Sequence, residues 1–210
     1  MNLLFYVPLL LKGALITLSA WIVAGIVSLM IGTFLGIVSC RYLAGTKIRM
    51  FVKCYTFIAK GVPAYVQILI AYFVIPALLG INIYGFFAAV SALAFCSSGY
   101  VTEIIRSGIN TVSRGQWDAS FVLGYSIKAT LLRIILPQAF KNVVPSLFGE
   151  LEQLLKSTSL LATIGITELT RAGMNIISRE LNPVVIYLTI ACMYLLFSAV
   201  LQLIVMYAEA

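Results

Sequence analysis

The sequence is poor in charge and contains no histidine. Only 10% of its 210 residues are charged, against about 25% in an ordinary soluble domain. The chain therefore has too few charged residues to cover a surface that faces water. The four cysteines stand far apart without a CxxC pair, and a zinc site, a disulfide framework and histidine-based catalysis therefore lack support. No GxxxxGK[ST], GxSxG or HExxH motif occurs. We expect a chain that is not an enzyme and holds no metal or cofactor of its own.

Apolar residues are abundant instead. They make up 62% of the chain, and the mean hydropathy is +1.07, which indicates an integral membrane protein. The net charge of +7 is not gathered into a basic patch with interleaved aromatic residues, as nucleic-acid binding would need. The distribution of Lys and Arg among the loops of a membrane protein accounts for it more simply.

Charged residues divide the chain into apolar runs, and a membrane-spanning helix needs about 20 residues. The uncharged run from Gly61 to Thr102 is about twice that length, so it must fold back, and Pro76, Gly80 and Asn82 supply a turn at its middle. We expect an all-α integral membrane protein with five transmembrane helices in one domain over residues 1–210. The expected spans cover residues 13–40, 62–79, 84–105, 141–164 and 183–207, with a long loop over 107–137.

The basic residues predict the orientation. Of the 14 Lys and Arg residues, ten fall in the loops 41–60 and 106–141, and three (Lys12, Arg171 and Arg179) fall on the other side of the membrane. Because basic residues concentrate in cytoplasmic loops, we expect the N-terminus outside, the C-terminus in the cytoplasm and both basic loops in the cytoplasm.

Small residues recur every four positions along the first span, and the pattern ends in a GxxxG motif. Such a face lets another helix backbone approach closely. Packing within the chain and a seam between two copies are both open. The residues concerned are Ala20, Ala24, Ser28, Gly32 and Gly36.

The loop over 107–137 has a helical pattern of its own. Trp117, Phe121 and Gly124 are spaced as on one face of a short helix. Gly124 breaks that helix, Ser126 is suited to cap a second one, and Pro137 ends the second helix or begins the next span. The loop is either an interfacial helical hairpin that anchors the bundle or a docking surface.

The stretch DAS (118–120), followed by Gly124 and by the IILP that ends at Pro137, resembles the EAA loop of the permeases of ATP-binding cassette (ABC) importers. Asp118 stands for the usual Glu and Ser120 for the second Ala. Three further stretches resemble motifs of the polar amino acid permeases, those of the histidine, glutamine and arginine importers. They are KGVPAYVQILIAYF (60–73), SSGYVTEIIRSGINTVSRGQWDA (97–119) and LLKSTSLLATIGITELTRAG (154–173).

The resemblance implies that the loop contains a coupling helix, which docks in a groove of a separate ABC ATPase subunit where ATP and Mg are bound. It also implies a second permease subunit, identical or homologous, and an extracytoplasmic amino acid binding protein. The location would be the bacterial inner (plasma) membrane. The docking residues would be Gln116, Trp117, Asp118, Ala119, Ser120, Leu123 and Gly124.

The fourth span contains charged residues, Glu150, Glu152 and Lys156, although a charge at the bilayer centre costs at least about 2.5 kcal/mol. One interpretation is a structural Glu152–Lys156 pair at i and i+4. The other is a site for a zwitterionic amino acid. Lys156 would then meet its carboxylate, a glutamate its amino group, and Ser157 and Ser159 would add hydrogen bonds. The usual aspartate of the family is replaced by Ser157.

The sequence therefore predicts the permease subunit of an ABC importer for polar amino acids, which forms the translocation path and is coupled to a separate ATPase. The alternative is a secondary transporter or channel-like subunit driven by an ion gradient. That alternative usually shows repeat symmetry or matching broken helices, and the sequence contains no such repeat.

Overall fold

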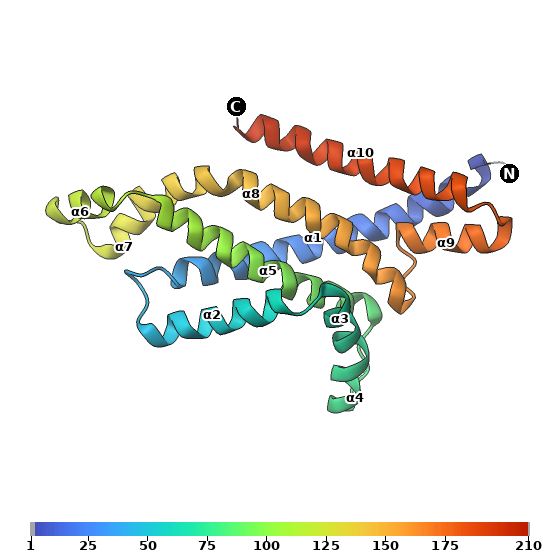
Figure 1. Cartoon of the computed structure of the whole chain (residues 1–210), viewed down its shortest axis with the longest axis horizontal. Helices are drawn as coiled ribbons and strands as arrows, with labels where there is room; N and C mark the ends of the chain where they lie inside the picture. The colour runs from blue at the N-terminus through green and yellow to red at the C-terminus, as the bar shows by residue number, and fades with distance from the viewer. Residues whose placement is uncertain (1–2, 210) are drawn as a thin grey trace. The chain divides into compact units, whose positions relative to one another are not determined.

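The structure is a computed structural model that describes residues 3–209, with side chains described for residues 4–207. All its regular elements are helices, and no strand occurs in this described part (Figure 1). Helices are the expected solution for apolar spans, because backbone N–H and C=O groups in hydrocarbon must pair within their own segment. The prediction of an all-α chain is confirmed.

The helices follow one another with short connections. The longer ones are α1 (Val7–Val38), α2 (Thr46–Gly61), α5 (Gly85–Thr111), α8 (Leu136–Ser157), α9 (Leu169–Glu180) and α10 (Pro183–Glu209). The shorter ones are α3 (Ala64–Leu69), α4 (Ile75–Leu79), α6 (Arg114–Val122) and α7 (Ile127–Thr130). Tight 3-10 turns cover Leu3–Tyr6 and Thr158–Ile164, and wider π-helical segments cover Ile70–Val74 and Leu131–Ile135.

Three helical segments of the described chain are long and apolar enough to cross a membrane: Leu4–Val38, Gly85–Thr111 and Pro183–Tyr207. A fourth is added if α2 and the helical segment after its break at Val62 and Pro63 form one span. Helix α8, which covers most of the expected fourth span, is not among them. The structure thus shows a membrane protein with three or four candidate spans, and the count of five remains a prediction.

Some helices extend past the expected boundaries, which had been placed at charged residues. Helix α1 begins at Val7 and contains Lys12, whose side chain is exposed. The first basic loop is helical over most of its length, as α2. A long Lys side chain can carry its charge to water from within a helix, so a charge marks the end of an apolar run but not the end of the helix.

The contacts divide the chain into two compact units. Unit 1 comprises Met1–Ile26, Pro63–Ala94 and Leu151–Ala210, and unit 2 comprises Val27–Val62 and Phe95–Glu150. Helices α1, α5 and α8 contribute residues to both units.

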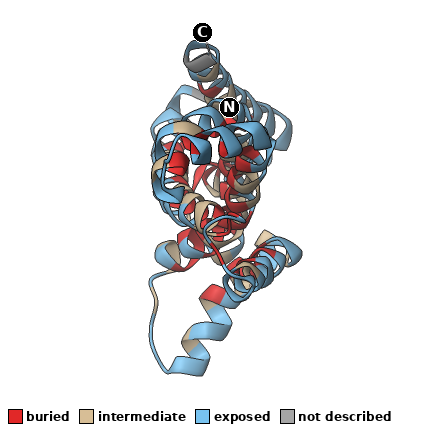
Figure 2. Cartoon of the chain, turned by 90° about the vertical axis from the view of Figure 1, so that its left-hand side faces the viewer, coloured by how far each residue is buried: buried red, intermediate tan, exposed pale blue. Residues whose placement is uncertain are grey.

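Each unit has its own apolar core, and the buried positions in Figure 2 follow the helix faces that pack together. One core of unit 1 contains Ala20, Ala24 and Leu93, and that of unit 2 contains Val101 and Ile135. Large apolar side chains also remain exposed along α1 and α10, as lipid-facing helices require.

The small residues of α1 pack against the chain's own helices. In unit 2, a Cβ atom at Gly32 would lie 2.5 Å from the Cβ of Val101, and one at Gly36 would lie 2.7 Å from the Cβ of Ile105. Ser28 is fully buried one turn earlier. The GxxxG face of α1 thus packs against α5 of the same chain. This arrangement agrees with the alternative of packing within the chain.

Candidate functional site

The α6–α7 hairpin has the expected order of helix, glycine bend and helix. Helix α6 ends before Gly124, which has a φ of +80°, a left-handed conformation that glycine adopts without steric cost. The Oγ of Ser126 then accepts a hydrogen bond from the backbone N–H of Ala129 at 3.3 Å and caps α7. The bend and the cap together fix the reversal of the chain.

Pro137 is the second residue of α8 and does not end the preceding helix. The backbone stays helical from α7 through the π-helical segment Leu131–Ile135 into α8. A wider turn before the proline accommodates its missing N–H. Pro137 therefore lies where the π-helical segment passes into α8, within one continuous helical stretch.

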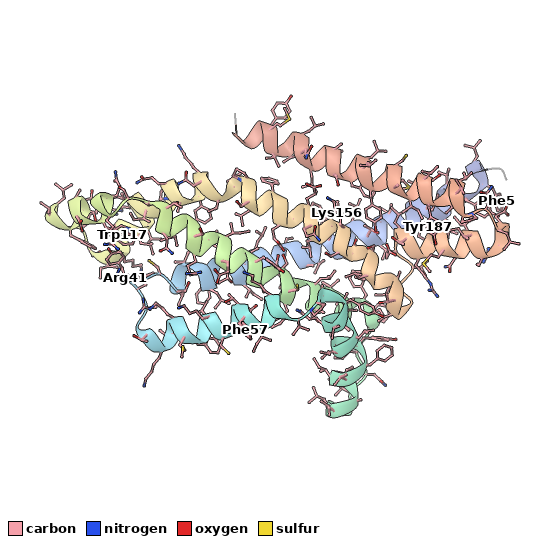
Figure 3. The ribbon with its side chains drawn as sticks, viewed as in Figure 1. Phe5, Arg41, Phe57, Trp117, Lys156 and Tyr187 are labelled. Carbon is pink, nitrogen blue, oxygen red and sulfur yellow. The ribbon has the colours of Figure 1, made fainter. Side chains whose placement is uncertain are left out.

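Two of the expected docking residues are turned toward the chain itself. Trp117 is buried, and its ring stacks on that of Tyr42 with centroids 4.2 Å apart. Trp117 is labelled in Figure 3, as is Arg41, the residue that precedes Tyr42. The hydroxyl of Ser120 is also buried and lies 2.9 Å from that of Thr130. Trp117 and Ser120 therefore hold α6 in place.

The remaining hairpin residues form an exposed surface. It is apolar beside the bend, where Val122 is 87% and Leu123 is 74% exposed. The sequence reasoning missed Val122, although its position next to Leu123 and Gly124 marks it as part of the same tip. The other exposed residues that were expected to dock are Gln116, Asp118, Ala119 and Gly124.

Glu150 has a polar partner that the sequence reasoning missed. The Oγ of Ser97, on α5, donates a hydrogen bond to Oε1 of Glu150 at 2.7 Å within unit 2. The adjacent serines at 97 and 98, within the more apolar first half of α5, were the available signal. The Nζ of Lys60 lies 5.3 Å from the ring centroid of Tyr100, also on α5.

A cavity of about 450 Å³ lies in the same unit. Lys60, Tyr100 and Glu103 line it together with the polar residues Ser107, Thr111, Asn142 and Ser146. It offers the cation of Lys60 and several hydrogen-bonding groups, whereas its carboxylate, Glu103, is paired with Arg106.

Glu152 and Lys156 form the ion pair that their spacing allows. Lys156 Nζ donates to Oε1 of Glu152 at 2.7 Å, and the Lys156 side chain, labelled in Figure 3, is 54% exposed. The hydroxyls of Ser157 and Ser159 donate to the backbone carbonyls of Gln153 and Lys156. The polar groups of this segment are thus bound to their own helix.

Glu150 and Glu152 are two residues apart on α8 and therefore leave opposite faces of that helix. The three charged residues of the expected span do not form one cluster along the helix. Glu150 pairs with a serine hydroxyl, whereas Glu152 pairs with Lys156.

Glu168 is a buried carboxylate to which the sequence reasoning gave no role. It precedes α9 and accepts hydrogen bonds from the backbone N–H groups of Thr170 and Arg171, both at 2.8 Å, and from the hydroxyl of Tyr194 at 3.2 Å. Thr17 also lies within reach, with its Oγ1 3.4 Å from the carboxylate. Glu168 therefore caps α9 and ties it to α1 and α10 inside unit 1.

Apolar helices of spanning length, with an exposed helix–glycine–helix hairpin between two of them, define an integral membrane protein of the permease class. Residues 28–210 match the family of binding-protein-dependent transport system inner membrane components. The chain belongs to this family.

Relatives cover most of the chain. The arginine transport system permease protein ArtQ of Bacillus subtilis is 37% identical over 165 residues, which are 79% of this chain and 74% of that protein. The putative glutamine transport system permease protein GlnP of Rickettsia prowazekii is 37% identical over 195 residues, 91% of this chain and 88% of that protein.

A solved structure described as an amino acid ABC transporter with histidines is 32% identical. It superposes with a TM-score of 0.91 over 99% of this chain and 96% of its own. The chain is the membrane-embedded permease subunit of an ABC importer and not an enzyme. A permease of this kind works with an ATPase and a substrate-binding protein.

Proposed function

We propose that this permease imports polar amino acids and that its α6–α7 hairpin is the surface that receives work from the ATPase. The observation that carries the coupling role is the exposed apolar tip at Val122 and Leu123, beside the left-handed Gly124. The chain has no phosphate-binding motif, so ATP and Mg would be bound by the partner. The substrate class is supported by the relatives named for arginine and glutamine transport.

The docking surface that we propose has two layers. The exposed residues Gln116, Asp118, Ala119, Leu123 and Gly124 would contact the ATPase. Trp117 and Ser120 would act one layer behind, since their buried contacts fix the orientation of α6. This support matters because α6 can transmit a movement of the ATPase to the rest of the permease only if α6 is rigidly attached to it.

The membrane topology that we propose has five spans, with α8 and the turn after it as the fourth, the N-terminus outside and the C-terminus in the cytoplasm. The distribution of basic residues supports it, because the hairpin and the start of α2 then lie on the cytoplasmic side. Five spans are few to enclose a path, so we include a second permease chain, identical or homologous. The location would be the bacterial inner membrane.

For the substrate, we favour Glu150 as the carboxylate that meets an amino group, because its hydrogen-bond partner from another helix is a neutral serine. A separate proposal is that Lys156, with Ser157 and Ser159, contacts the substrate carboxylate and Glu152 its amino group, because Glu150 leaves another face of α8. Using Lys156 in this way requires its pair with Glu152 to open, and a pair that is half exposed opens at little cost.

Reconstitution tests the proposal. The permease is co-purified with its ATPase, placed in proteoliposomes with the binding protein outside, and assayed for uptake of labelled arginine, histidine and glutamine. ATP-dependent uptake of at least one of them is expected. Uptake that persists without ATP and follows an imposed ion gradient would contradict the proposal and favour a secondary transporter.

The role of Glu150 has its own variant. Glu150→Gln keeps the size and the hydrogen bond from Ser97 but removes the charge, so uptake should fall while the permease still co-purifies with the ATPase. Glu180→Gln, at an exposed position of α9 outside the proposed substrate site, serves as the control.

A further inference from the structure

A second cavity in unit 2 has no part in the proposed path. Its volume is about 340 Å³, and it lies among the end of α1, the first half of α2 and the last half of α5. Four cationic side chains line it, those of Arg41, Arg49, Lys53 and Arg106, against the single carboxylate of Glu103. Arg106 forms an ion pair with Glu103, so the other three cations have no carboxylate opposite them among the residues that line the cavity.

The start of α2 adds further positive potential to the cavity. Thr46, Arg49 and Met50 of its first turns line the wall. The N-cap residue is Gly45, no side chain caps the first N–H groups, and the first turn contains no acidic residue. The N-terminus of a helix carries a partial positive charge and exposed N–H donors. Basic side chains beside the N-terminus of α2 are repelled by this partial positive charge. An anion bound between the side chains and the N-terminus would relieve the repulsion.

Two guanidinium groups at the cavity present unused donors. The Nε atoms of Arg49 and Arg106 are buried, and neither has a hydrogen-bond partner in the described part of the chain. A buried N–H without an acceptor costs free energy and is rare in native proteins. Both atoms belong to residues that line the cavity, so the described chain does not satisfy these two guanidinium groups completely.

We infer that this cavity binds a phosphate-bearing anion. Guanidinium groups match the oxygens of a phosphate with paired hydrogen bonds, and a helix N-terminus binds the same group. The anion would neutralise the excess of cations and accept hydrogen bonds from the guanidinium groups that line the cavity. The inference rests on unit 2 alone and does not depend on the substrate proposed above.

The phosphate can come from a free ion or from the headgroup of an acidic phospholipid. The surroundings suit a headgroup, since Met50 lines the cavity and is 70% exposed, and Phe51 beside it is 67% exposed. Acyl chains would then lie on these side chains. Clusters of Lys and Arg directly beside a membrane span bind acidic headgroups in this way, provided that this end of unit 2 lies at the cytoplasmic surface.

The experiment uses the permease purified with its ATPase. One arm measures the thermal unfolding midpoint in detergent while inorganic phosphate is titrated, with chloride at equal ionic strength as reference. The other arm compares nanodiscs of phosphatidylcholine with nanodiscs that also contain phosphatidylglycerol, and native mass spectrometry counts retained lipid. Stabilisation by phosphate alone identifies the free ion, and stabilisation by phosphatidylglycerol identifies the headgroup.

Arg49→Gln should weaken the response about tenfold in apparent affinity, because it removes a charge-assisted donor group. Lys47→Gln is the matched control, since Lys47 lies in the same turn of α2 and carries the same charge but does not line the cavity. It should respond as the wild type does. Lys53→Gln is a second variant at an exposed cavity position, for use if Arg49→Gln does not fold.

Two results would overturn the inference. One is the absence of any stabilisation of the wild type by phosphate or by phosphatidylglycerol. The other is an equal loss of response in Arg49→Gln, Lys53→Gln and Lys47→Gln, since that would reflect the overall charge of α2 and not a site.

Discussion

The α6–α7 hairpin and helix α9 are both short helical segments that follow a longer helix, but they are held in different ways. The N-terminus of α9 is capped by the buried carboxylate of Glu168, which also reaches Tyr194 of α10. The N-cap of α6, Ser113, makes no side-chain hydrogen bond, and the hairpin rests on an aromatic stack and a pair of hydroxyls.

The difference suits the two segments to different tasks. The first N–H groups of helix α9 are satisfied by Glu168 inside its own unit, which fixes the start of the helix. The hairpin fixes one face through Trp117 and leaves Val122 and Leu123 exposed. A segment that is anchored on one side and unsatisfied on the other is suited to a partner, and the predictions below test that contrast.

Gly124→Trp should have the largest effect. A tryptophan at the tip would obstruct the docking surface, and its left-handed conformation would add about 1–2 kcal/mol of backbone strain. We expect loss of co-purification with the ATPase and of ATP-dependent uptake. Gly124→Ala carries the same strain without the bulk and should retain both activities in large part. If Gly124→Trp still couples ATP hydrolysis to uptake, the docking assignment is wrong.

Trp117→Ala removes the support of the hairpin and not its surface. Deleting a buried tryptophan typically costs about 3–5 kcal/mol, so we expect a lower unfolding midpoint and weaker ATPase binding. Phe121→Ala is the control, because Phe121 belongs to the same aromatic group but is partly exposed. Equal effects of the two substitutions would contradict a special role for the stack on Tyr42.

Glu168→Gln tests the other side of the comparison. The amide would keep one acceptor and place an NH₂ group against a backbone N–H, at a cost of about 1–3 kcal/mol. The unfolding midpoint should fall while ATPase binding is unchanged. Glu180→Gln, an exposed position at the other end of α9, should give a smaller shift. A loss of ATPase binding in Glu168→Gln would show that the two segments are not independent.

Lys156→Ala should have the smallest effect on stability, since a half-exposed i,i+4 pair is worth about 0–1 kcal/mol. If Lys156 contacts the substrate carboxylate, uptake falls while the assembled complex remains intact. Normal uptake by Lys156→Ala would leave the residue with the structural role of its pair alone.

Much of the fold could be predicted from the sequence because it depends on composition. Scarce charge and long apolar runs require helices that span a membrane, and the Gly124 bend with the Ser126 cap follows from local backbone chemistry. Helix limits were less predictable. Helix α1 passes through Lys12, and the basic stretch before Gly61 is a helix, because a charge interrupts hydrophobicity without interrupting backbone hydrogen bonds.

The contacts of side chains could not be predicted in the same way. Trp117 and Ser120 were expected on the docking surface, but Trp117 stacks on Tyr42, which precedes α2, and Ser120 meets Thr130 across the hairpin. The same holds for Ser97 beside Glu150. Local spacing shows which residues share a helix face and does not show which helix covers that face.

The sequence by itself determined the membrane class, the hairpin pattern and, through its motifs, the family, since these depend on composition and on residues close together in the chain. Only the tertiary structure decided which polar groups are satisfied: Glu168 by α9 and Tyr194, and Glu150 by Ser97, whereas the Nε atoms of Arg49 and Arg106 have no hydrogen-bond partner among the residues that the structure describes. The physical reason is that hydrogen bonds and charge balance are set by neighbours in space, which segments distant in sequence supply.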